Sequence, residues 1–318
     1  MRYVLRADAS QLIGAGHVMR SSAIAEELIA QGEDVVFVGQ ITGLPWVAER
    51  IASLGFVNIY DSPNHFFSNN SSDVLLLDSY EIDIDDNFIA PENWFQIVAI
   101  VDDLTPNYRC SLRIHPGLES IWIGESKAPV LAGPKYIPFR SSLSRKISTS
   151  AQEPRRLKII VVAGGSDPHN LVLEIARVLA TFPESFDAYL FSNSSSAVTT
   201  DDRFHYLAIG STLDEVSSDA DLVLTTSSTS SLEFIARGFC VGVACAVDNQ
   251  RHYYDSLGEH GVAAQIGLRT QSSGWDLEVE TIHMLISQSD FRERLTSKAV
   301  GLIDFHGASR IVEAITNL

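Results

Sequence analysis

The sequence has few cysteines and no long apolar run, and these absences exclude several classes of protein. Its three cysteines, Cys110, Cys240 and Cys245, show no C-x-x-C spacing, which argues against a disulfide framework. They are typical of reduced core residues in a cytosolic protein. No apolar run is long enough for a signal peptide or a membrane span. We therefore expect a cytoplasmic protein that does not insert into a membrane.

Basic residues are also scarce. The chain has 23 lysines and arginines against 40 aspartates and glutamates, a net charge of -17. An acidic surface repels nucleic acid at long range, so we expect no nucleic-acid partner. Any phosphate-bearing small molecule must then be held by local donors, because no basic field is available to attract it.

Several motifs of metal and nucleophile chemistry are missing. The nine histidines show no H-x-H or H-E-x-x-H spacing, and there is neither a P-loop lysine motif nor a G-x-S-x-G elbow. The run Asp83, Asp85 and Asp86 contains a D-x-D spacing that can hold a divalent cation, although a solvated loop is the better interpretation. We expect no metal and no cofactor.

The patterns that are present predict an α/β protein with two domains. A chain of 318 residues exceeds the usual size of one core. Short apolar runs alternate with amphipathic stretches, which is typical of a parallel sheet covered by helices. Predicted strands of the first half are 3–7, 34–39, 56–60, 73–77 and 95–103, and those of the second half are 157–162, 188–193, 204–210, 221–226 and 240–246.

The same order of strand, glycine turn and helix begins again after a polar, basic segment. We therefore predict an N-terminal Rossmann-like domain over 1–145, a linker over 146–155 and a C-terminal Rossmann-like domain over 156–318. The amphipathic stretch 307–318 is a candidate to pack back on the first domain. Two such sheets bind ligands at the carboxyl ends of their strands, so we expect a cleft between the domains.

The first glycine turn runs from Gly14 to Arg20 and carries a histidine, His17, where the loop becomes a helix. Because Met19 occupies the third glycine position of G-x-G-x-x-G, the turn is a weak dinucleotide signal. The positive end of the helix disfavours imidazolium, so His17 is expected to be neutral near pH 7 and able to accept a proton. A merely packed or capping histidine is an equal alternative. Substrate contacts are expected at Gly14, Gly16 and Arg20, and Asp8 is a candidate to orient the ring.

A second glycine turn, GGSDP, follows the apolar strand at 157–162. Its backbone N–H groups and the following helix can form a nest for phosphate without a lysine. The residues assigned to this nest are Gly164, Gly165, Ser166 and Asp167. The alternative is an ordinary connection in which Ser166 or Asp167 caps the helix.

A run of hydroxyl residues opens a predicted helix after the strand 221–226. Its members can donate to phosphate oxygens, and Glu233 can accept both hydroxyls of a ribose; plain capping is the alternative. The predicted donors are Ser227, Ser228, Thr229, Ser230 and Ser231. A polar cluster with Asn249 and Gln250 follows the next strand, at the edge where the cleft is expected.

The ordered segments RADAS, IGAGHVMR, DSYEID, VDDL, AGGSDPHN, SSTSSLEF and DNQ resemble the PseG/SpsG group of UDP-sugar hydrolases. That group is related in fold to MurG, the glycosyltransferase that makes lipid II. The resemblance implies a GT-B fold and removal of UDP from a 2,4-diacetamido-2,4,6-trideoxyhexose in pseudaminic acid biosynthesis. It places the family's catalytic histidine at His17, its cleft tyrosine at Tyr80 and a sugar-side residue at Asn249.

The chain departs from the family pattern at two places on the presumed sugar side. It has Asp78-Ser79-Tyr80-Glu81 where the family has D-H-Y-G, and Ile114-His115-Pro116 where relatives often have D-Q-N. Three hypotheses therefore stand: a monomeric, inverting UDP-sugar hydrolase with His17 as base, a glycosyltransferase that uses a UDP-sugar, and a non-catalytic nucleotide-sugar binding protein of glycan assembly.

Overall fold

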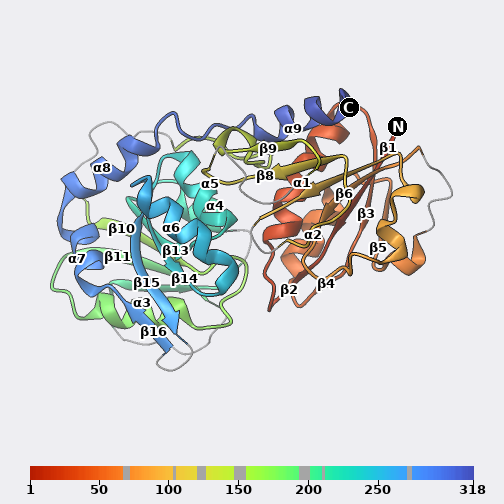
Figure 1. The fold of residues 1–318 in the computed structure, drawn as a ribbon. Helices are drawn as coiled ribbons and strands as arrows, with labels where there is room; N and C mark the ends of the chain where they lie inside the picture. Colours follow the sequence, from red (N-terminus) through yellow and green to blue (C-terminus); the bar gives the residue numbers. More distant parts are fainter. Residues whose placement is uncertain are drawn as a thin grey trace. The chain divides into compact units, whose positions relative to one another are not determined.

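The computed structural model describes residues 1–66, 72–102, 105–119, 127–146, 155–192, 201–209, 212–270 and 274–318. They form two compact units, unit 1 with Met1–Leu143 and Asp304–Leu318 and unit 2 with Ser144–Ile303. Each unit contains one seven-stranded sheet with helices packed on it (Figure 1). The predicted class, two Rossmann-like α/β domains with parallel sheets, is confirmed.

The sheet of unit 1 is parallel throughout and has the order β5-β3-β1-β6-β7-β8-β9. Its strands are β1 (Arg2–Ala7), β3 (Asp34–Val38), β5 (Asn58–Tyr60), β6 (Val74–Asp78), β7 (Gln96–Ile100), β8 (Leu112–His115) and β9 (Val130–Ala132). A separate pair joins β2 (Ala9–Ser10) to β4 (Ile41–Thr42). The helices are α1 (Gly16–Ala30), α2 (Pro45–Ser53), η1 (Pro63–His65), η2 (Asn87–Ile89), η3 (Pro91–Asn93), η4 (Pro134–Tyr136) and α9 (Gly307–Thr316).

Both faces of this sheet are buried, because alternate side chains of each strand enter different cores. Leu5 packs on the face that α1 covers, together with Ile24 and Leu28 of that helix. Val4 packs on the other face with Trp94. Because both faces of the sheet are buried, successive residues of a strand are apolar rather than alternating with polar ones.

The last helix, α9, belongs to unit 1 although it follows unit 2 in the sequence. Its Ile311 and Ile315 lie in the same core as α1 and β1, and α9 lies beside α1 in Figure 1. A Cβ atom on Gly307 would lie 2.0 Å from the carbonyl oxygen of Ile137, so only glycine permits this backbone approach. The amphipathic stretch at the C-terminus thus completes the first core.

The sheet of unit 2 has the order β12-β11-β10-β13-β14-β15-β16, with only β16 antiparallel. Its strands are β10 (Leu157–Val162), β11 (Phe186–Phe191), β12 (Phe204–Leu207), β13 (Leu222–Thr226), β14 (Cys240–Cys245), β15 (Ala264–Thr270) and β16 (Gly274–Leu277). The helices are α3 (Leu171–Ala180), α4 (Leu213–Ser217), α5 (Thr229–Arg237), η5 (Asp248–Gln250), α6 (Arg251–Glu259), α7 (Val279–Ser287) and α8 (Ser289–Ala299).

Each sheet has one point at which the strand order changes direction. It lies between β1 and β6 in unit 1 and between β10 and β13 in unit 2. Ligands of open α/β sheets bind outside the carboxyl ends of the strands at such switch points. A ligand is therefore expected at the loops after these four strands, which contain the glycine turns and the hydroxyl run.

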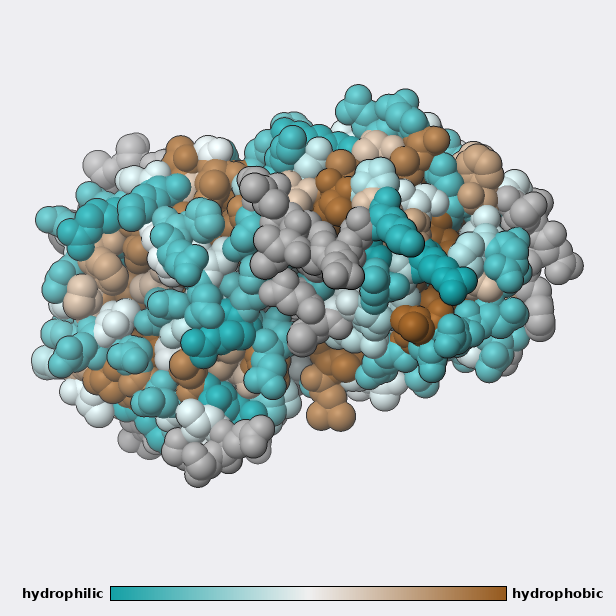
Figure 2. Space-filling view, in the orientation of Figure 1, coloured by the Kyte–Doolittle hydropathy of each residue, from teal (hydrophilic) through white to brown (hydrophobic). Residues whose placement is uncertain are grey.

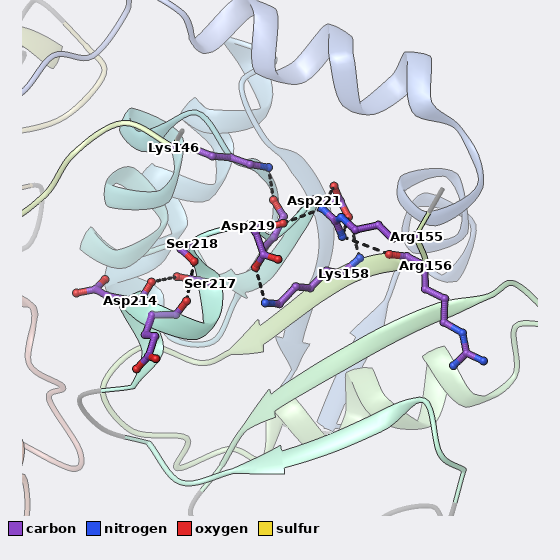
Figure 3. Close-up of polar contacts among 11 residues, drawn as sticks. Lys146, Arg155, Arg156, Lys158, Asp214, Ser217, Ser218, Asp219 and Asp221 are labelled. Carbon is purple, nitrogen blue, oxygen red and sulfur yellow. Dashed lines mark hydrogen bonds and ion pairs between the residues drawn. The ribbon is translucent and has the colours of Figure 1, made fainter. Parts of the chain in front are cut away.

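Acidic and basic side chains meet at the opposite, amino ends of β10 and β13 (Figure 3). Arg155 donates to both carboxylate oxygens of Asp221 at 2.8 and 2.9 Å, and Lys158 pairs with Asp219. Lys146 donates to a backbone carbonyl of the same turn. Residues 147–154 of the predicted linker lie outside the described residues, but the basic residues at its ends anchor the start of unit 2.

Four strands of the two seven-stranded sheets are absent from the sequence prediction, for identifiable reasons. β9 has only three residues, and β8 contains Arg113 and His115, which hide its apolar character. The pairing of β15 with β14 shifts register next to Val243, and Gly267 adopts a φ of 145°. β16 alternates half-buried with exposed residues at the sheet edge.

The surface mixes polar and apolar residues. On the face seen in Figure 2, hydrophobic residues occur as separate groups among hydrophilic ones. Throughout the described ranges, every helix is too short or too polar to cross a bilayer.

We predict that Ile311→Ala destabilises unit 1, because Ile311 is fully buried against α1 and the sheet. The expected loss is about 2–5 kcal/mol, as for other isoleucines deleted from cores. Thermal unfolding measures it, and Glu313→Ala, an exposed position on the same helix, is the control. Equal melting temperatures for Ile311→Ala and the parent would contradict the placement of α9.

Candidate functional site

His17 is the second residue of α1, directly after a tight loop. The loop is closed by reciprocal backbone bonds between Ser10 and Gly14, and Gly14 has a φ of 79° that favours glycine. No side chain caps α1, and its first turn has no acidic residue. The positive end of the helix is therefore not neutralised locally, which favours an electron-rich ligand near His17.

The ring of His17 is half-buried and packs edge-on against Tyr80, with ring centroids 4.4 Å apart and planes at 82°. Tyr80 lies two residues after the end of β6, so the two rings come from the two strands of the switch point. The ring forms no hydrogen bond with any residue in the described ranges. Its nitrogens are thus available to a water molecule or a substrate hydroxyl.

A buried ionic network lies beside this histidine. Arg20 donates to both oxygens of Asp78, at 2.7 and 2.6 Å, and Ser21 donates to the same carboxylate at 2.8 Å. Arg20 also lies 3.7 Å from a carboxylate oxygen of Asp102, which follows β7. The Tyr80 hydroxyl donates to Asp102. Helix α1 and the ends of β6 and β7 are thereby joined beneath the site.

These surroundings shift the pKa values of the site. Burial lowers the pKa of His17, and the positive charge of Arg20 lowers it further, while the carboxylates of Asp78 and Asp102 oppose the shift. His17 is therefore neutral near pH 7. The position of His17 at the helix terminus predicts the same protonation state, but burial is the leading cause in the structure.

The other two titrating groups keep their ordinary charge states. Burial raises the pKa of the Asp78 carboxyl, but Arg20 and the neighbouring hydrogen bonds outweigh it and hold the pKa below its usual range. Burial, and then the charge of Asp102, raises the pKa of Tyr80. The phenol therefore remains a hydrogen-bond donor throughout the neutral range.

Two predicted roles in unit 1 need correction. Arg20 is among the predicted substrate contacts, but its side chain is buried and its donors are directed to Asp78. Asp8 is the predicted orienting group of His17, yet it pairs with Arg6 at 2.6 Å and accepts the Gln40 N–H at 2.7 Å. Asp8 acts on His17 through its charge, which raises the pKa of the ring.

The GGSDP turn of unit 2 abuts the end of β13. Gly164 has a φ of 67°, and a Cβ atom there would lie 3.8 Å from the Thr226 hydroxyl. Asp167 does not face a ligand: its carboxylate accepts the N–H groups of Leu171 and Val172 and so caps α3. The alternative considered for Asp167, an ordinary helix cap, is therefore the correct one. The backbone of Gly164, Gly165 and Ser166 remains the candidate nest.

Some hydroxyls of the run form hydrogen bonds within the protein, and others do not bond to the described residues. Ser227 donates to carbonyls of Ala244 and Gln250, and Ser231 donates to the carbonyl of Ser228, so these two hydroxyls maintain the local fold. Ser228 shares a hydrogen bond with Thr226. No side chain caps α5, which begins at Thr229.

Thr229 and Ser230 are the two hydroxyl residues left at the beginning of α5. Both are half-buried, and neither side chain bonds to another residue in the described ranges. Together with the first N–H groups of the helix they can bind an anion. Glu233 is half-buried one turn further along α5.

The loop after β14 completes the candidate site of unit 2. Gln250 accepts the Ala246 N–H at 3.0 Å, so the oxygen of its side chain shapes the loop. The side-chain oxygen of Asn249 is shielded from solvent and accepts no hydrogen bond within the described part of the chain. A shielded oxygen without a partner is suited to accept a hydrogen bond from a bound ligand.

The described residues contain no group of three histidine, cysteine, aspartate or glutamate side chains that converge as a metal site. In the D-x-D segment, Asp83 accepts the N–H of Asp85 and Asp86 accepts that of Phe88. Both carboxylates thus stabilise turns.

Sequence reasoning missed Asp102, although it lies in the quoted VDDL segment. The available signal was its position, a carboxylate at the end of the strand next to the switch point. Asp103 and Leu104 of the same segment lie outside the described residues.

Comparisons with known proteins agree with this architecture. No protein-family model matches the sequence. The chain is 25% identical over 191 residues to the UDP-2,4-diacetamido-2,4,6-trideoxy-beta-L-altropyranose hydrolase of Campylobacter jejuni, an alignment over 56% of the chain. It is 21% identical over its whole length to an uncharacterized protein of Methanocaldococcus jannaschii. Each alignment spans 66% of the relative.

Solved structures with the same fold include glycosyltransferases. MurG of Acinetobacter baumannii has a TM-score of 0.64 at 14% identity, with both chains covered completely. The glycotransferase of kitacinnamycin has a TM-score of 0.68 at 14% identity, over 99% of this chain and 98% of that one. SpnG with thymidine diphosphate has a TM-score of 0.65 at 13% identity, over 98% and 100%. The predicted GT-B fold is confirmed.

We predict that Asp78→Asn destabilises the protein by about 3–5 kcal/mol, because it removes the carboxylate that the buried Arg20 guanidinium binds through two hydrogen bonds. The pKa of Asp78 is below its usual value, so its ionic stabilisation is present above about pH 4 and is lost as the pH falls further. Denaturant unfolding between pH 3 and pH 7 measures both effects.

The Asn variant should lose the acid-dependent part contributed by Asp78. Asp255→Asn is the matched control, because its pair with Arg251 is exposed and should contribute less than about 1 kcal/mol. Equal losses in the two variants would contradict the buried network.

Proposed function

We propose that the chain is a UDP-sugar hydrolase of the GT-B class, in which unit 2 binds UDP and unit 1 supplies the base. The observation that carries the proposal is His17: a neutral imidazole at the switch point, without a hydrogen bond to the described residues and beside a buried ionic network. A catalytic base requires these properties. The similarity to the Campylobacter jejuni hydrolase supports the proposal.

In the proposed reaction His17 takes a proton from water as the water oxygen attacks the anomeric carbon. The bond between that carbon and the diphosphate oxygen breaks, its electron pair leaves with UDP, and the configuration inverts. Base catalysis of this kind contributes about 10²–10⁴-fold in rate. Tyr80 and Asn249 would orient the sugar or the water.

The departing diphosphate gains negative charge as the bond breaks. We assign its stabilisation to backbone N–H groups of the Gly164–Ser166 turn and to the beginning of α5 with Thr229 and Ser230. Glu233 would accept the ribose hydroxyls. These neutral donors suit a protein of net charge -17, and the mechanism requires no metal and no cofactor.

The substrate we propose is a UDP-2,4-diacetamido-2,4,6-trideoxyhexose. The support is the name of the Campylobacter jejuni relative and the resemblance of the motifs. We further propose a cytoplasmic monomer acting in pseudaminic acid biosynthesis, without nucleic-acid or membrane partners.

A glycosyltransferase is the second candidate, because the similar solved structures are glycosyltransferases. Both reactions need a base at the same position. Incubation with the UDP-sugar alone separates them: rapid release of UDP and free sugar favours hydrolysis, whereas release only after an acceptor is added favours transfer. UDP binding without either reaction would indicate a binding protein.

We predict that His17→Asn lowers turnover by at least about 100-fold, since the variant lacks a base, while the affinity for UDP stays within about twofold. UDP release and calorimetric UDP binding measure the two properties. The parent enzyme should lose kcat/KM as the pH falls through the lowered pKa of His17. Unchanged turnover in His17→Asn would refute the proposed base.

We predict that Thr229→Val and Ser230→Ala each weaken UDP binding by roughly tenfold, the loss of one hydrogen bond to a charged group. Binding of uridine, which has no phosphate, should not change. Ser287→Ala removes a hydroxyl from α7 and is the control. Equal losses for UDP and uridine would show that these hydroxyls do not contact the diphosphate.

A further inference from the structure

We propose that Asp102 is a positioning residue for His17: it holds the ring through Tyr80 and places a balancing negative charge beside it. This inference rests on the proposed function, because it assigns the support of the base. Asp102 follows β7 and is far from His17 in the sequence.

Asp102, Tyr80 and His17 form a chain of contacts that holds the imidazole ring. Asp102 accepts hydrogen bonds from the Tyr80 hydroxyl and from the Thr105 hydroxyl, the latter at 3.2 Å. Thr105 also accepts the Asp102 N–H at 2.9 Å, which fixes the carboxylate. The anchored phenol ring then meets the edge of His17 at 4.4 Å between centroids. Asp102 therefore limits the orientations open to the imidazole.

The electrostatic part follows from the charges that surround the ring. The described groups that act on His17 are Asp8 after β1, Arg20 in α1, Asp78 in β6 and Asp102 after β7. Arg6 pairs with Asp8, and Arg20 binds Asp78 through two hydrogen bonds.

Three carboxylates thus accompany two guanidiniums among these five groups. The group as a whole keeps one negative charge until His17 becomes imidazolium. When His17 takes up a proton, its positive charge cancels the net negative charge of the five groups. The transition state, in which the proton is arriving, is therefore stabilised more than the resting state. Preorganised charge of this kind accelerates a reaction without reorganisation of the site.

Asp102→Asn tests the electrostatic part, because it keeps the shape and an acceptor for Tyr80 while removing the charge. The proton affinity of His17, followed by NMR titration of its ring in the protein without substrate, should fall by about 3–10-fold. The signal is identified by its absence in His17→Asn. Turnover should fall about tenfold, and the acid limb of kcat/KM should move to lower pH, with UDP affinity unchanged.

Asp73→Asn is the matched control, because Asp73 is an equally buried carboxylate paired with an arginine, but it lies at the amino end of β6. It should leave the His17 titration unchanged. A titration that moves equally in both variants, or in neither, would overturn the proposal. This readout needs no catalysis, so a parent enzyme that releases no UDP refutes the proposed function separately.

Tyr80→Phe tests the mechanical part, because it keeps the ring and removes the hydroxyl that binds Asp102. Turnover should fall, and adding Tyr80→Phe to Asp102→Ala should slow the alanine variant by no more than about twofold, since that variant already lacks the acceptor that the Tyr80 hydroxyl binds. Losses that multiply in the double variant would show that Asp102 does not act through Tyr80.

Discussion

The bidentate pair between Arg20 and Asp78 is the constraint on which the candidate site depends. A buried guanidinium has a large desolvation cost, which is offset only when both of its hydrogen bonds to the carboxylate are well aligned. Arg20 and His17 are three residues apart and so share one face of α1. The pair that fixes the rotation of the helix on the sheet therefore also fixes the direction of His17.

The topology of each sheet explains why polar side chains collect where they do. In both units the switch point separates the loops after two adjacent parallel strands, and the helices α1, α3 and α5 begin after such loops. Unit 1 places an imidazole on an ionic network at this point. Unit 2 has a glycine turn beside the end of β13, the strand that precedes the uncapped beginning of α5. An acidic protein can bind a diphosphate with such dipoles, without lysine or arginine.

Most polar groups near these loops serve the fold. Asp167 caps α3, Ser227 bonds to the neighbouring loop, and Asp8 pairs with Arg6. Because a buried polar group must find a partner, the structural demands are met first and few side chains remain for a ligand. The remaining candidates in the described ranges, such as His17 and Thr229, are identified by the absence of such a partner.

The sequence by itself determined the α/β class, the tandem organisation and the positions of the two glycine turns and the hydroxyl run. These features depend on local periodicity and on glycine, which a linear pattern records. Only the tertiary structure decided that Arg20 binds Asp78, 58 residues away, and that Tyr80 reaches Asp102 across 22 residues. The reason is physical: burial and hydrogen-bond partners arise when distant strands meet, so the roles of individual polar side chains at the site cannot be read from their neighbours in the chain.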